Sequence, residues 1–440
     1  MTSAASRPDS SGGEPMRIAY LLSRYPAVSH TFFLKEVLGL KERGMTVEAA
    51  SVNRPDRPLE ALSGDEVRET QLTYYIKDGR WLALLFKIAA IELRHPIVTL
   101  CGVLAALTLG GWDLRERAYA VLYLAEALLV GDWMRRRSLT HLHVHFGGAV
   151  AAVGFLVSAA WRVPWSLTLH GPNEFFDQNQ LFLEKKIEST AFVFCVSDYG
   201  RSQVLRVAPD LDPARVEVLR LGVDCDQLQP RQFPEADCGP CLEPEPVHLV
   251  CTGRLAPEKG HLLLLDAVAQ LAGLGFPVDL VLIGDGPERR TLEERARRNG
   301  LADRVQFTGA LSHADTLARV AAADIFVLAS FAEGLPVALM EAMALAVVCV
   351  STCVNGIPEL IVSEENGLLV CAGNAGELSA ALARLAADAG LRRTLGLAGR
   401  RTVEADYNLS RNIDLLAASF RRRLHGELAP EPVLAEAMRP

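Results

Sequence analysis

Two glutamates, Glu333 and Glu341, stand eight positions apart in the stretch "EGLPVALME". The second lies among valine, leucine and methionine, where an ionised carboxylate costs free energy unless it gains hydrogen-bond donors. The preceding run, "DIFVLAS", has the pattern of a buried strand, and Pro336 suits the first position of a helix. Glu333 would then precede that helix, and the amides of Gly334 and Leu335 would point out of its positively polarised start, where anions such as phosphate bind.

Helical spacing makes the second glutamate the more informative one. Val337, Met340, Glu341 and Ala344 share one face of the predicted helix, at i, i+3, i+4 and i+7. Glu341 would therefore point the same way as the core residues. A vicinal diol, such as that of a ribose, would supply two hydrogen-bond donors to it. The alternative is a buried ion pair with an arginine.

Two cations follow another predicted strand in the same half of the chain, in the stretch "TGRLAPEKG". Arg254 and Lys259 are five positions apart across a turn that contains a proline. Each alone would be read as a solvated surface charge, but beside a helix start the two can converge on one diphosphate. Charge-assisted hydrogen bonds of this kind contribute about 1.5–3 kcal/mol each. With the two glutamates, these cations indicate a nucleotide site.

The elements that must position these residues alternate between short apolar strands and helical patterns along most of the chain. This rhythm is typical of parallel sheets, and it predicts two doubly wound α/β domains in series, with ligands bound at the carboxyl ends of the strands. A proline-rich linker separates them. The expected organisation is a disordered tail (1–15), a first domain (16–228) with a helical insertion (about 60–140), the linker (229–246), a second domain (247–405), a terminal helix (406–425) and a flexible tail (426–440).

Length and composition bound the function. A chain of 440 residues, half of them hydrophobic, is comfortable as two domains of roughly 200 residues each. The formal charge of −8 argues against a nucleic-acid partner, whose phosphates need a basic face. The nine cysteines lack the spacing of a secreted disulfide framework, and the N-terminus lacks the apolar core of a signal peptide. The expected location is therefore the cytoplasm.

One stretch complicates this expectation. Residues 96–112, "PIVTLCGVLAALTLGGW", carry no charge, although they fall short of the roughly 20 residues that a spanning helix needs. One interpretation is a buried helix. The other is a helix lying against the inner face of the cytoplasmic membrane, which the neighbouring "WLALLFKIAAIELR" and the arginines at 135–137 favour. For the whole stretch 81–137 both interpretations stay open.

Two groups of residues have the types, but not the full pattern, of a metal site. Cys238 and Cys241 form a CxxC that no second ligand pair follows at zinc spacing. His141, His143 and His145 alternate on one predicted strand without a local carboxylate or cysteine to complete a site, which favours partly buried histidines beside the cleft. No metal is expected at either place.

Further motifs support the two-domain pattern. In the second half they are "GRLAPEKG", "GDGPERRTLE", "FTGALS", "EGLPVALMEAMA" and "NGIPELI"; in the first half, "SHTFFLKEV", "HVHFG", "TLHG", "VSDYGR" and "LGVD". In this order and spacing they resemble the retaining glycosyltransferases of family 4. That resemblance implies the GT-B fold, in which two Rossmann-like domains face a cleft and a terminal helix crosses back to the first domain. The first half looks most like bacterial enzymes of exopolysaccharide, colanic-acid-type or lipid-linked glycan synthesis.

The resemblance implies roles for residues of the second domain. Arg254 and Lys259 would bind the diphosphate of a nucleotide-sugar donor and stabilise its charge as it leaves. Glu341 would bind the ribose hydroxyls and Glu333 the donor sugar. The other implied donor contacts come from the amides of Gly334 and Leu335, which would meet sugar or phosphate, and from the backbone near Gly309 and Leu311, which would meet the base.

In the first domain the resemblance implies a histidine near the reacting sugar, His170 of "TLHG", and a phosphate and acceptor loop that contains Ser29 and Thr31. The chain also departs from the family pattern. Where the family usually has glycine and proline after "EAMA", this chain has Ala346 and Val348, which alters a turn behind the donor site. The first loop reads "SRYPAVSHT" and lacks the common double glycine.

These observations predict an enzyme that transfers a sugar, with retention of configuration, from a nucleotide diphosphate sugar to a hydroxyl of a glycan or lipid-linked acceptor. No cofactor is expected, because two cations and a helix dipole can stabilise the leaving phosphate without a metal. No residue is identified as a carboxylate nucleophile. The alternatives are a nucleotide-sugar epimerase of the same architecture and a non-catalytic sugar-nucleotide sensor or scaffold.

Overall fold

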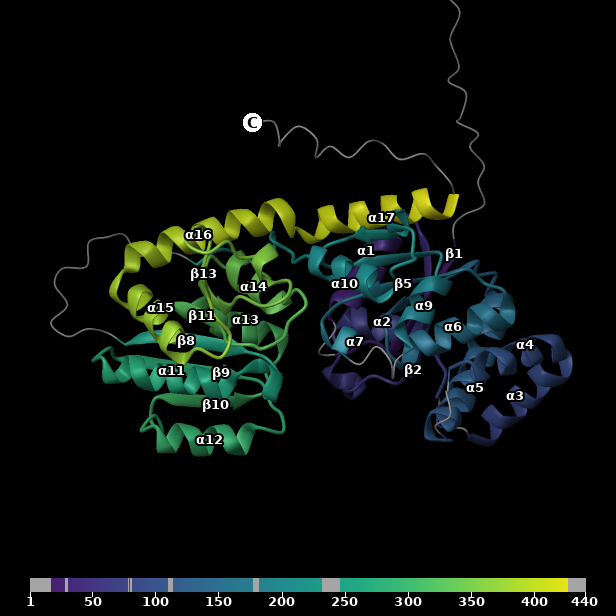
Figure 1. Ribbon diagram of the computed structural model, residues 1–440, viewed down its shortest axis with the longest axis horizontal. Coiled ribbons are helices and arrows are strands. Elements are labelled where there is room, and N and C mark those ends of the chain that lie inside the picture. The colour runs from purple at the N-terminus through teal and green to yellow at the C-terminus, as the bar shows by residue number, and fades with distance from the viewer. Residues whose placement is uncertain are drawn as a thin grey trace, which may run out of the picture.

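The chain folds into two α/β lobes that lie side by side, with two long helices running across both (Figure 1). These helices are α16 (Ala389–Asp406) on the second lobe and α17 (Leu409–His425) on the first. The prediction of two doubly wound parallel-sheet domains is confirmed. The computed structural model describes residues 17–27, 31–77, 79, 81–109, 114–176, 182–231 and 246–425.

The first lobe is built on a seven-stranded parallel sheet of order β3-β2-β1-β4-β5-β6-β7. Its strands are β1 (Arg17–Arg24), β2 (Thr46–Asn53), β3 (Tyr74–Tyr75), β4 (His141–His145), β5 (Trp165–Leu169), β6 (Phe192–Cys195) and β7 (Val216–Val218). The reversal of order beside β1 is the switch point at which open α/β sheets bind ligands. The covering helices are α1 (Thr31–Glu42), α6 (Ala149–Trp161), α7 (Asn173–Phe176), α9 (Leu183–Ser189) and α10 (Asp198–Val207), with a short 3-10 turn, η3 (Pro213–Arg215), before β7.

The second lobe repeats this plan with a six-stranded parallel sheet of order β10-β9-β8-β11-β12-β13. Its strands are β8 (Val247–Thr252), β9 (Val278–Ile283), β10 (Val305–Gly309), β11 (Ile325–Leu328), β12 (Val348–Thr352) and β13 (Leu368–Val370). Between them lie η4 (Pro257–Lys259), α11 (His261–Gly273), α12 (Arg289–Arg298), α13 (His313–Ala322), α14 (Val337–Ala344), η5 (Ile357–Glu359) and α15 (Ala375–Ala387). The strand β11 is wholly apolar and buried, and β12 is buried along its whole length, as parallel strands covered on both faces must be.

An insertion between β2 and β4 adds helices to the first lobe, and the last three of them form its far end (Figure 1). It comprises η2 (Leu59–Ala61), α2 (Gly64–Leu72), α3 (Trp81–Arg94), α4 (Pro96–Leu107) and α5 (Leu114–Arg137). No single helix of the described segments is long and apolar enough to cross a membrane, although α3 and α4, bent by 107°, together meet the criteria of length and composition. The buried-helix interpretation of residues 96–112 is wrong over α4, which leaves large apolar side chains exposed.

Side chains from both lobes hold the junction between them. Glu359, in η5, accepts hydrogen bonds from the backbone amides of Asp198 and Tyr199 (2.8 and 2.7 Å), so a carboxylate of the second lobe caps the start of α10 in the first. On the other side, α17 packs on α1, where Arg43 pairs with Asp414 at 2.6 Å. The helix α17 follows the second lobe in the sequence but packs on the first lobe, and it therefore ties the two lobes together.

The turn after α14 carries one of the departures from the family pattern. Ala346 has a left-handed backbone with φ of 56°, a conformation that costs an L-residue roughly 1 kcal/mol more than glycine. We therefore expect Ala346→Gly to raise the free energy of unfolding by about 0.5–1 kcal/mol, measured by urea denaturation. Ala342→Gly, in the preceding helix, is the opposite control and should destabilise. A loss of stability in Ala346→Gly would contradict this account.

Candidate functional site

The predicted donor residues of the second lobe stand in the loops after β8, β10 and β11, at the carboxyl edge of the sheet. Arg254 is exposed there, two residues beyond β8. Lys259 ends η4, and its side chain runs past Gly253: a Cβ on this glycine would lie 4.0 Å from the Lys259 Cδ and Cε atoms. The two cations thus approach the same loop, as the spacing in "GRLAPEK" predicts.

Lys259 is held by the first glutamate of the pair. Its Nζ donates to Glu333 Oε1 at 2.7 Å, and Ser330 Oγ donates to the same oxygen at 2.6 Å. Glu333 is buried, whereas the Lys259 side chain keeps about a quarter of its surface exposed. Because the carboxylate is buried and doubly bonded, it fixes the direction of the ammonium group. Glu333 therefore positions a cation, a role that its sequence neighbours alone do not show.

The loop that carries Glu333 meets the first lobe at the predicted histidine. Gly334 packs so tightly that a Cβ on it would lie 1.9 Å from the carbonyl oxygen of His170 and 3.0 Å from Gly171 Cα. Only glycine fits this approach, so the "EGLP" loop and the "TLHG" loop come together in the cleft. Leu335 is buried beneath, and α14 begins at Val337, one residue later than predicted.

Glu341 lies within α14, with about one seventh of its side chain exposed. Burial raises the pKa of this carboxyl to about 7, and the charge of Lys35, from α1 of the first lobe, partly opposes the shift. The ring of His313, at the start of α13, is 3.6 Å from Glu341 Oε1. Among the described residues no arginine pairs with Glu341, so the alternative of a buried Glu–Arg pair does not hold there.

The predicted base-binding backbone closes the same edge. Gly309 ends β10 with φ of 74° and is buried, and Leu311 packs against the core of the second lobe from the loop that follows. A Cβ on Gly309 would lie 3.3 Å from an Arg289 guanidinium nitrogen. In the first lobe, Thr31 is half-buried at the start of α1. Ser29 falls outside the described residues, as do Cys238 and Cys241.

A chain of polar contacts, which the sequence did not reveal, lies behind His170. His170 Nε2 is 2.9 Å from His145 Nδ1, and His145 Nε2 is 3.3 Å from Glu36 Oε1. Tyr20 donates its hydroxyl to the same glutamate oxygen at 2.7 Å. Glu36 stands on α1 and Tyr20 on β1, so three separated segments meet at the end of β4.

The histidines of β4 are fully buried, not partly buried as predicted. Glu36 supplies the carboxylate that their local sequence lacks, and its oxygen lies within 4.8 Å of ligand atoms of His143 and His145. Both ring nitrogens of His143 already have hydrogen-bond partners, Ser166 at 2.8 Å and Thr168 at 2.9 Å. Burial moves the pKa of His143 well below its usual value, so it stays neutral. These contacts fit a structural hydrogen-bond network better than a metal centre.

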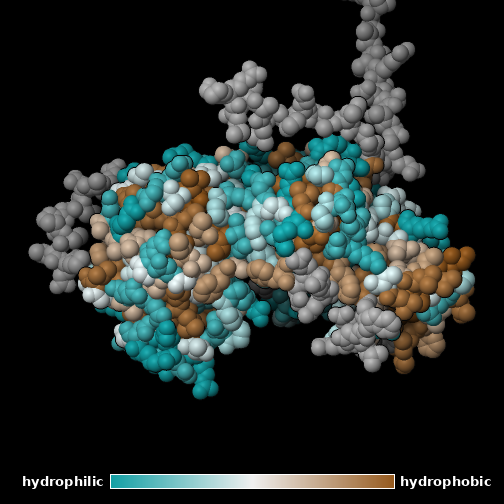
Figure 2. All heavy atoms as spheres, viewed as in Figure 1, coloured by the Kyte–Doolittle hydropathy of each residue, from teal (hydrophilic) through white to brown (hydrophobic). Residues whose placement is uncertain are grey.

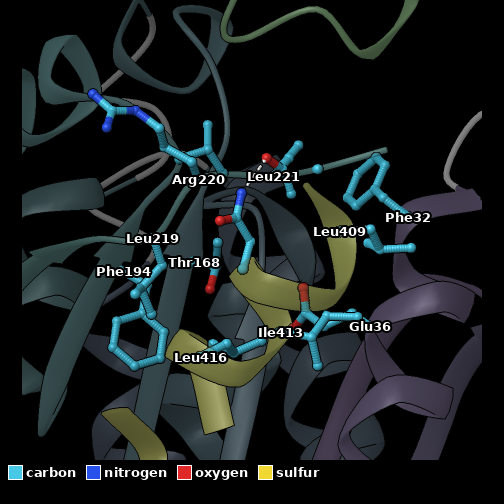
Figure 3. A pocket seen from close by; sticks show the side chains of 13 residues that line it. Phe32, Glu36, Thr168, Phe194, Leu219, Arg220, Leu221, Leu409, Ile413 and Leu416 are labelled. Carbon is cyan, nitrogen blue, oxygen red and sulfur yellow. Dashed lines mark hydrogen bonds between the residues drawn. The ribbon is translucent and has the colours of Figure 1, made fainter. Parts of the chain in front are cut away.

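A small cavity opens beside this network, between α17 and the carboxyl ends of β5 and β6 (Figure 3). Apolar side chains such as Phe32, Phe194 and Leu416 form much of its wall, with Glu36 and Thr168 among the polar groups. A hydrogen bond from the Asn412 side chain to the Leu221 carbonyl (2.9 Å) spans one side. The terminal helix thus reaches the region of the predicted site.

Two family models match the chain, and they divide it where the lobes divide. The model described as Glycosyltransferase Family 4 matches residues 31–227, and the model described as Glycosyl transferases group 1 matches residues 246–388. The chain belongs to glycosyltransferase family 4. It is therefore a glycosyltransferase of the GT-B type.

Relatives that match more than four-fifths of the chain are named for colanic acid and amylovoran biosynthesis. The putative colanic acid biosynthesis glycosyltransferase WcaL of Escherichia coli K12 is 25% identical, over 84% of this chain and 90% of its own. The amylovoran biosynthesis glycosyltransferase AmsK of Erwinia amylovora is 26% identical, over 89% and 96%. Among solved structures, HepE of Anabaena in complex with UDP and glucose shares the fold, with a TM-score of 0.68 at 17% identity over 92% and 99%.

Proposed function

We propose that this glycosyltransferase transfers a hexose from a nucleotide diphosphate sugar to a hydroxyl of a glycan or lipid-linked acceptor in exopolysaccharide synthesis, with retention of configuration and without a metal. The observation that carries the donor class is the meeting of the "EGLP" loop with Lys259 on one side and His170 on the other. It brings a fixed cation, a helix start and the loop that carries His170 to one place.

The donor fits these groups one by one. Lys259 and Arg254 would bind the diphosphate, the amides of Gly334 and Leu335 would meet phosphate or sugar, and Glu341 would accept hydrogen bonds from the ribose. The backbone near Gly309 would meet the base. The relative HepE, which was solved with UDP and glucose, supports this class of donor.

The proposed retention depends on the face from which the acceptor attacks, and the two cations support the reaction by stabilising the leaving diphosphate. As the bond from C1 to the phosphate oxygen breaks, its electron pair stays on the diphosphate, which Lys259 and Arg254 stabilise. The acceptor hydroxyl attacks C1 on the face that the phosphate leaves, and its proton passes to the leaving phosphate oxygen. The cations supply the electrostatic stabilisation that a divalent metal supplies elsewhere, so the proposed reaction needs none.

The acceptor side of the proposal rests on the first lobe. WcaL and AmsK are named for polysaccharide synthesis, and polymers of this kind offer hydroxyl acceptors. The exposed apolar helices of the insertion add contact with the inner face of the cytoplasmic membrane, where a lipid-linked acceptor would be found.

The experiment first screens UDP-, GDP- and dTDP-sugars for thermal stabilisation, because a ligand that binds only the folded state raises its midpoint. The stabilising donor is then incubated with the enzyme in EDTA, and proton NMR follows the anomer first released by hydrolysis. We expect the anomer of the donor, with activity unaffected by EDTA. Release of the opposite anomer, or loss of activity in EDTA, would overturn retention or metal independence respectively.

A further inference from the structure

Helices α3 and α4 are apolar on the face that points away from the protein as well as on the face that packs. On α3, Leu82, Phe86 and Leu93 recur at helical spacing, and each is about three-quarters or more exposed. The opposite face of α3 packs Leu84 and Ile88 against the core of the first lobe. A helix of this kind buries half of its apolar surface and leaves the other half without a protein neighbour in the described chain.

The second helix repeats this arrangement. Gly102 of α4 packs closely on α5, where a Cβ would lie 2.5 Å from a Leu124 methyl group. Large apolar residues at i, i+3, i+7 and i+10 face outward. We call the exposed set the apolar cap: Leu82, Leu85, Phe86, Leu93, Ile97, Leu100, Leu104 and Leu107. Figure 2 shows hydrophobic residues gathered at the end of the molecule where these helices lie. A contiguous apolar surface of this kind marks an interaction site.

The charges around the apolar cap identify the partner. Among the described side chains of the insertion from 82 to 137, the exposed acid is Glu92, whereas the exposed cations are Lys87, Arg94, Arg117, Arg135, Arg136 and Arg137. Asp132 and Glu48 offset part of the charge of the last three. The chain as a whole carries −8, so this end is locally reversed in sign. Lys87 and Arg94 directly follow Phe86 and Leu93 and flank the apolar stripe.

We propose that the apolar cap docks into the headgroup region of an anionic lipid bilayer, with the flanking cations on lipid phosphates. A second copy of the chain is the less suitable partner, because pairing two such ends would bring cations of the same sign together. Long cationic side chains beside apolar ones suit an interface in which one end is apolar and the other is wet. The inference rests on the proposed function and deepens its acceptor side, since it holds the enzyme at the lipid surface where a lipid-linked acceptor would be found.

The test is co-sedimentation of the full chain with vesicles of phosphatidylcholine alone and of phosphatidylcholine with phosphatidylglycerol. We expect binding to the mixed vesicles that weakens in high salt, and at least a tenfold weaker binding in the double variant Phe86→Glu with Leu93→Glu. The matched control is Leu274→Glu with Leu415→Glu, two exposed leucines elsewhere, which should bind like the natural protein.

Three results would overturn the inference. These are no binding by the natural chain, equal binding by the cap variant, and a dimer in light scattering that the cap variant dissociates, which would identify a second copy as the partner. Donor hydrolysis in solution should be the same in the cap variant as in the natural chain. Loss of vesicle binding with hydrolysis retained therefore tests this surface separately from the proposed function.

The chain of polar contacts behind His170 carries a second, independent inference. Glu36 Oε1 accepts from Tyr20 at 2.7 Å and makes a contact of 3.3 Å with His145 Nε2. An ionised carboxylate oxygen offers no proton, so this contact favours the tautomer of His145 that carries its proton on Nε2 and has an acceptor at Nδ1. His170 must in turn donate from Nε2 to that atom, at 2.9 Å. We infer that Glu36 and His145 are positioning residues that fix His170 in the tautomer whose Nδ1 accepts a hydrogen bond.

This tautomer has a consequence for the proposed reaction, on which the inference rests. An acceptor Nδ1, which is buried in this structure, can accept a hydrogen bond from a hydroxyl group once substrate is bound but cannot donate one to the leaving phosphate. Removing the imidazole of His145 would let His170 populate both tautomers and rotate. We expect this change to lower kcat and to leave the affinity for the donor unchanged, because the proposed diphosphate and ribose contacts lie on the second lobe.

The first measurement needs no variant. Long-range proton–nitrogen NMR spectra of the natural chain should show that His170 carries its proton on Nε2. A proton on Nδ1 instead would overturn the inference. The His145→Phe variant, which keeps a ring among Phe33 and Phe146, should lower kcat at least tenfold with KM for the donor within twofold. An unchanged kcat, or a change confined to KM, would also overturn it.

Two matched controls separate positioning from packing. His141 is on the same strand and is fully buried, but its side chain contacts Ser166 and does not take part in the chain of contacts to His170. The variant His141→Phe should therefore retain kcat. At position 36, Glu36→Gln keeps an oxygen that accepts from both neighbours and should retain most of the activity. Glu36→Leu removes that oxygen and should behave like His145→Phe. Equal effects of glutamine and leucine would contradict the assignment.

Discussion

The substitution Lys259→Met should lower kcat/KM for the nucleotide-sugar donor by about a hundredfold to a thousandfold. Methionine keeps an unbranched apolar chain beside Gly253 but removes the ammonium group that would stabilise the leaving diphosphate. Removing one such group from an active site costs about 2.7–4 kcal/mol of transition-state stabilisation. Glu333 would also lose its ion-pair partner while buried. The measurement is donor hydrolysis, with thermal unfolding of each variant to show that the fold persists.

A second ion pair of the chain provides the matched control. Lys41 donates to Glu69 at 2.6 Å, with a lysine about as exposed as Lys259 and a glutamate that is fully buried. Lys41→Met should therefore lower stability by a similar amount, and its kcat/KM should stay within a factor of about three. If both lysine variants slow the enzyme equally, the loss at Lys259 reflects folding and the assignment of the cation to the diphosphate is wrong.

The double variant Lys259→Met with Glu333→Gln tests how the pair acts. If Glu333 mainly directs the lysine, removing it after the lysine is gone should cost little more, so the two effects will not add. The double variant should then be about as slow as Lys259→Met alone and more stable, because no carboxylate is left buried without a cation. Additive losses would show that Glu333 contacts the donor independently.

Most of the fold was predictable because its signals are local. Buried parallel strands such as β11 read as continuous apolar runs, and the stop of α1 follows from Gly44, which has φ of 76°. The same holds for the donor loops, since each motif lies within one strand–loop–helix unit. The order of the strands follows from the few topologies that right-handed connections permit.

What the sequence could not show depends on contacts between distant segments. Lys259 and Glu333 are in separate motifs, and only the adjacency of β8 and β11 in the sheet brings them together. The link from Glu36 to His145 crosses the whole insertion, so the histidines seemed to lack a carboxylate. For α4 the wrong prediction of burial has another cause. A helix that is apolar on all sides is expected to be buried from its composition alone, but its sequence does not show what covers it.

The substitution Glu341→Gln should make the empty enzyme more stable and the donor bind more weakly. Burial raises the pKa of this carboxyl from 4.5 to about 7. Between these pH values the folded chain holds a proton that the unfolded chain has released, so the free energy of unfolding falls as pH rises, and the whole cost is present above pH 7. Glutamine carries no charge to desolvate. At pH 8 it should therefore raise the free energy of unfolding by roughly 1–3 kcal/mol.

Donor binding should show the opposite dependence. Ribose hydroxyls donate to the ionised carboxylate, so affinity should rise through about pH 7 and then level off, and calorimetry of the natural enzyme should show proton release on binding below that pH. In Glu341→Gln the affinity should fall at least tenfold at pH 8 and lose this rise. His313→Gln controls for the neighbouring ring, whose pKa burial lowers from 6.5, so the rise near pH 7 should persist. A variant that is less stable at pH 8, or donor affinity independent of pH, would mean that Glu341 is structural. If Glu341 instead lowers the stability of the empty enzyme and strengthens donor binding, its role is to bind the nucleoside.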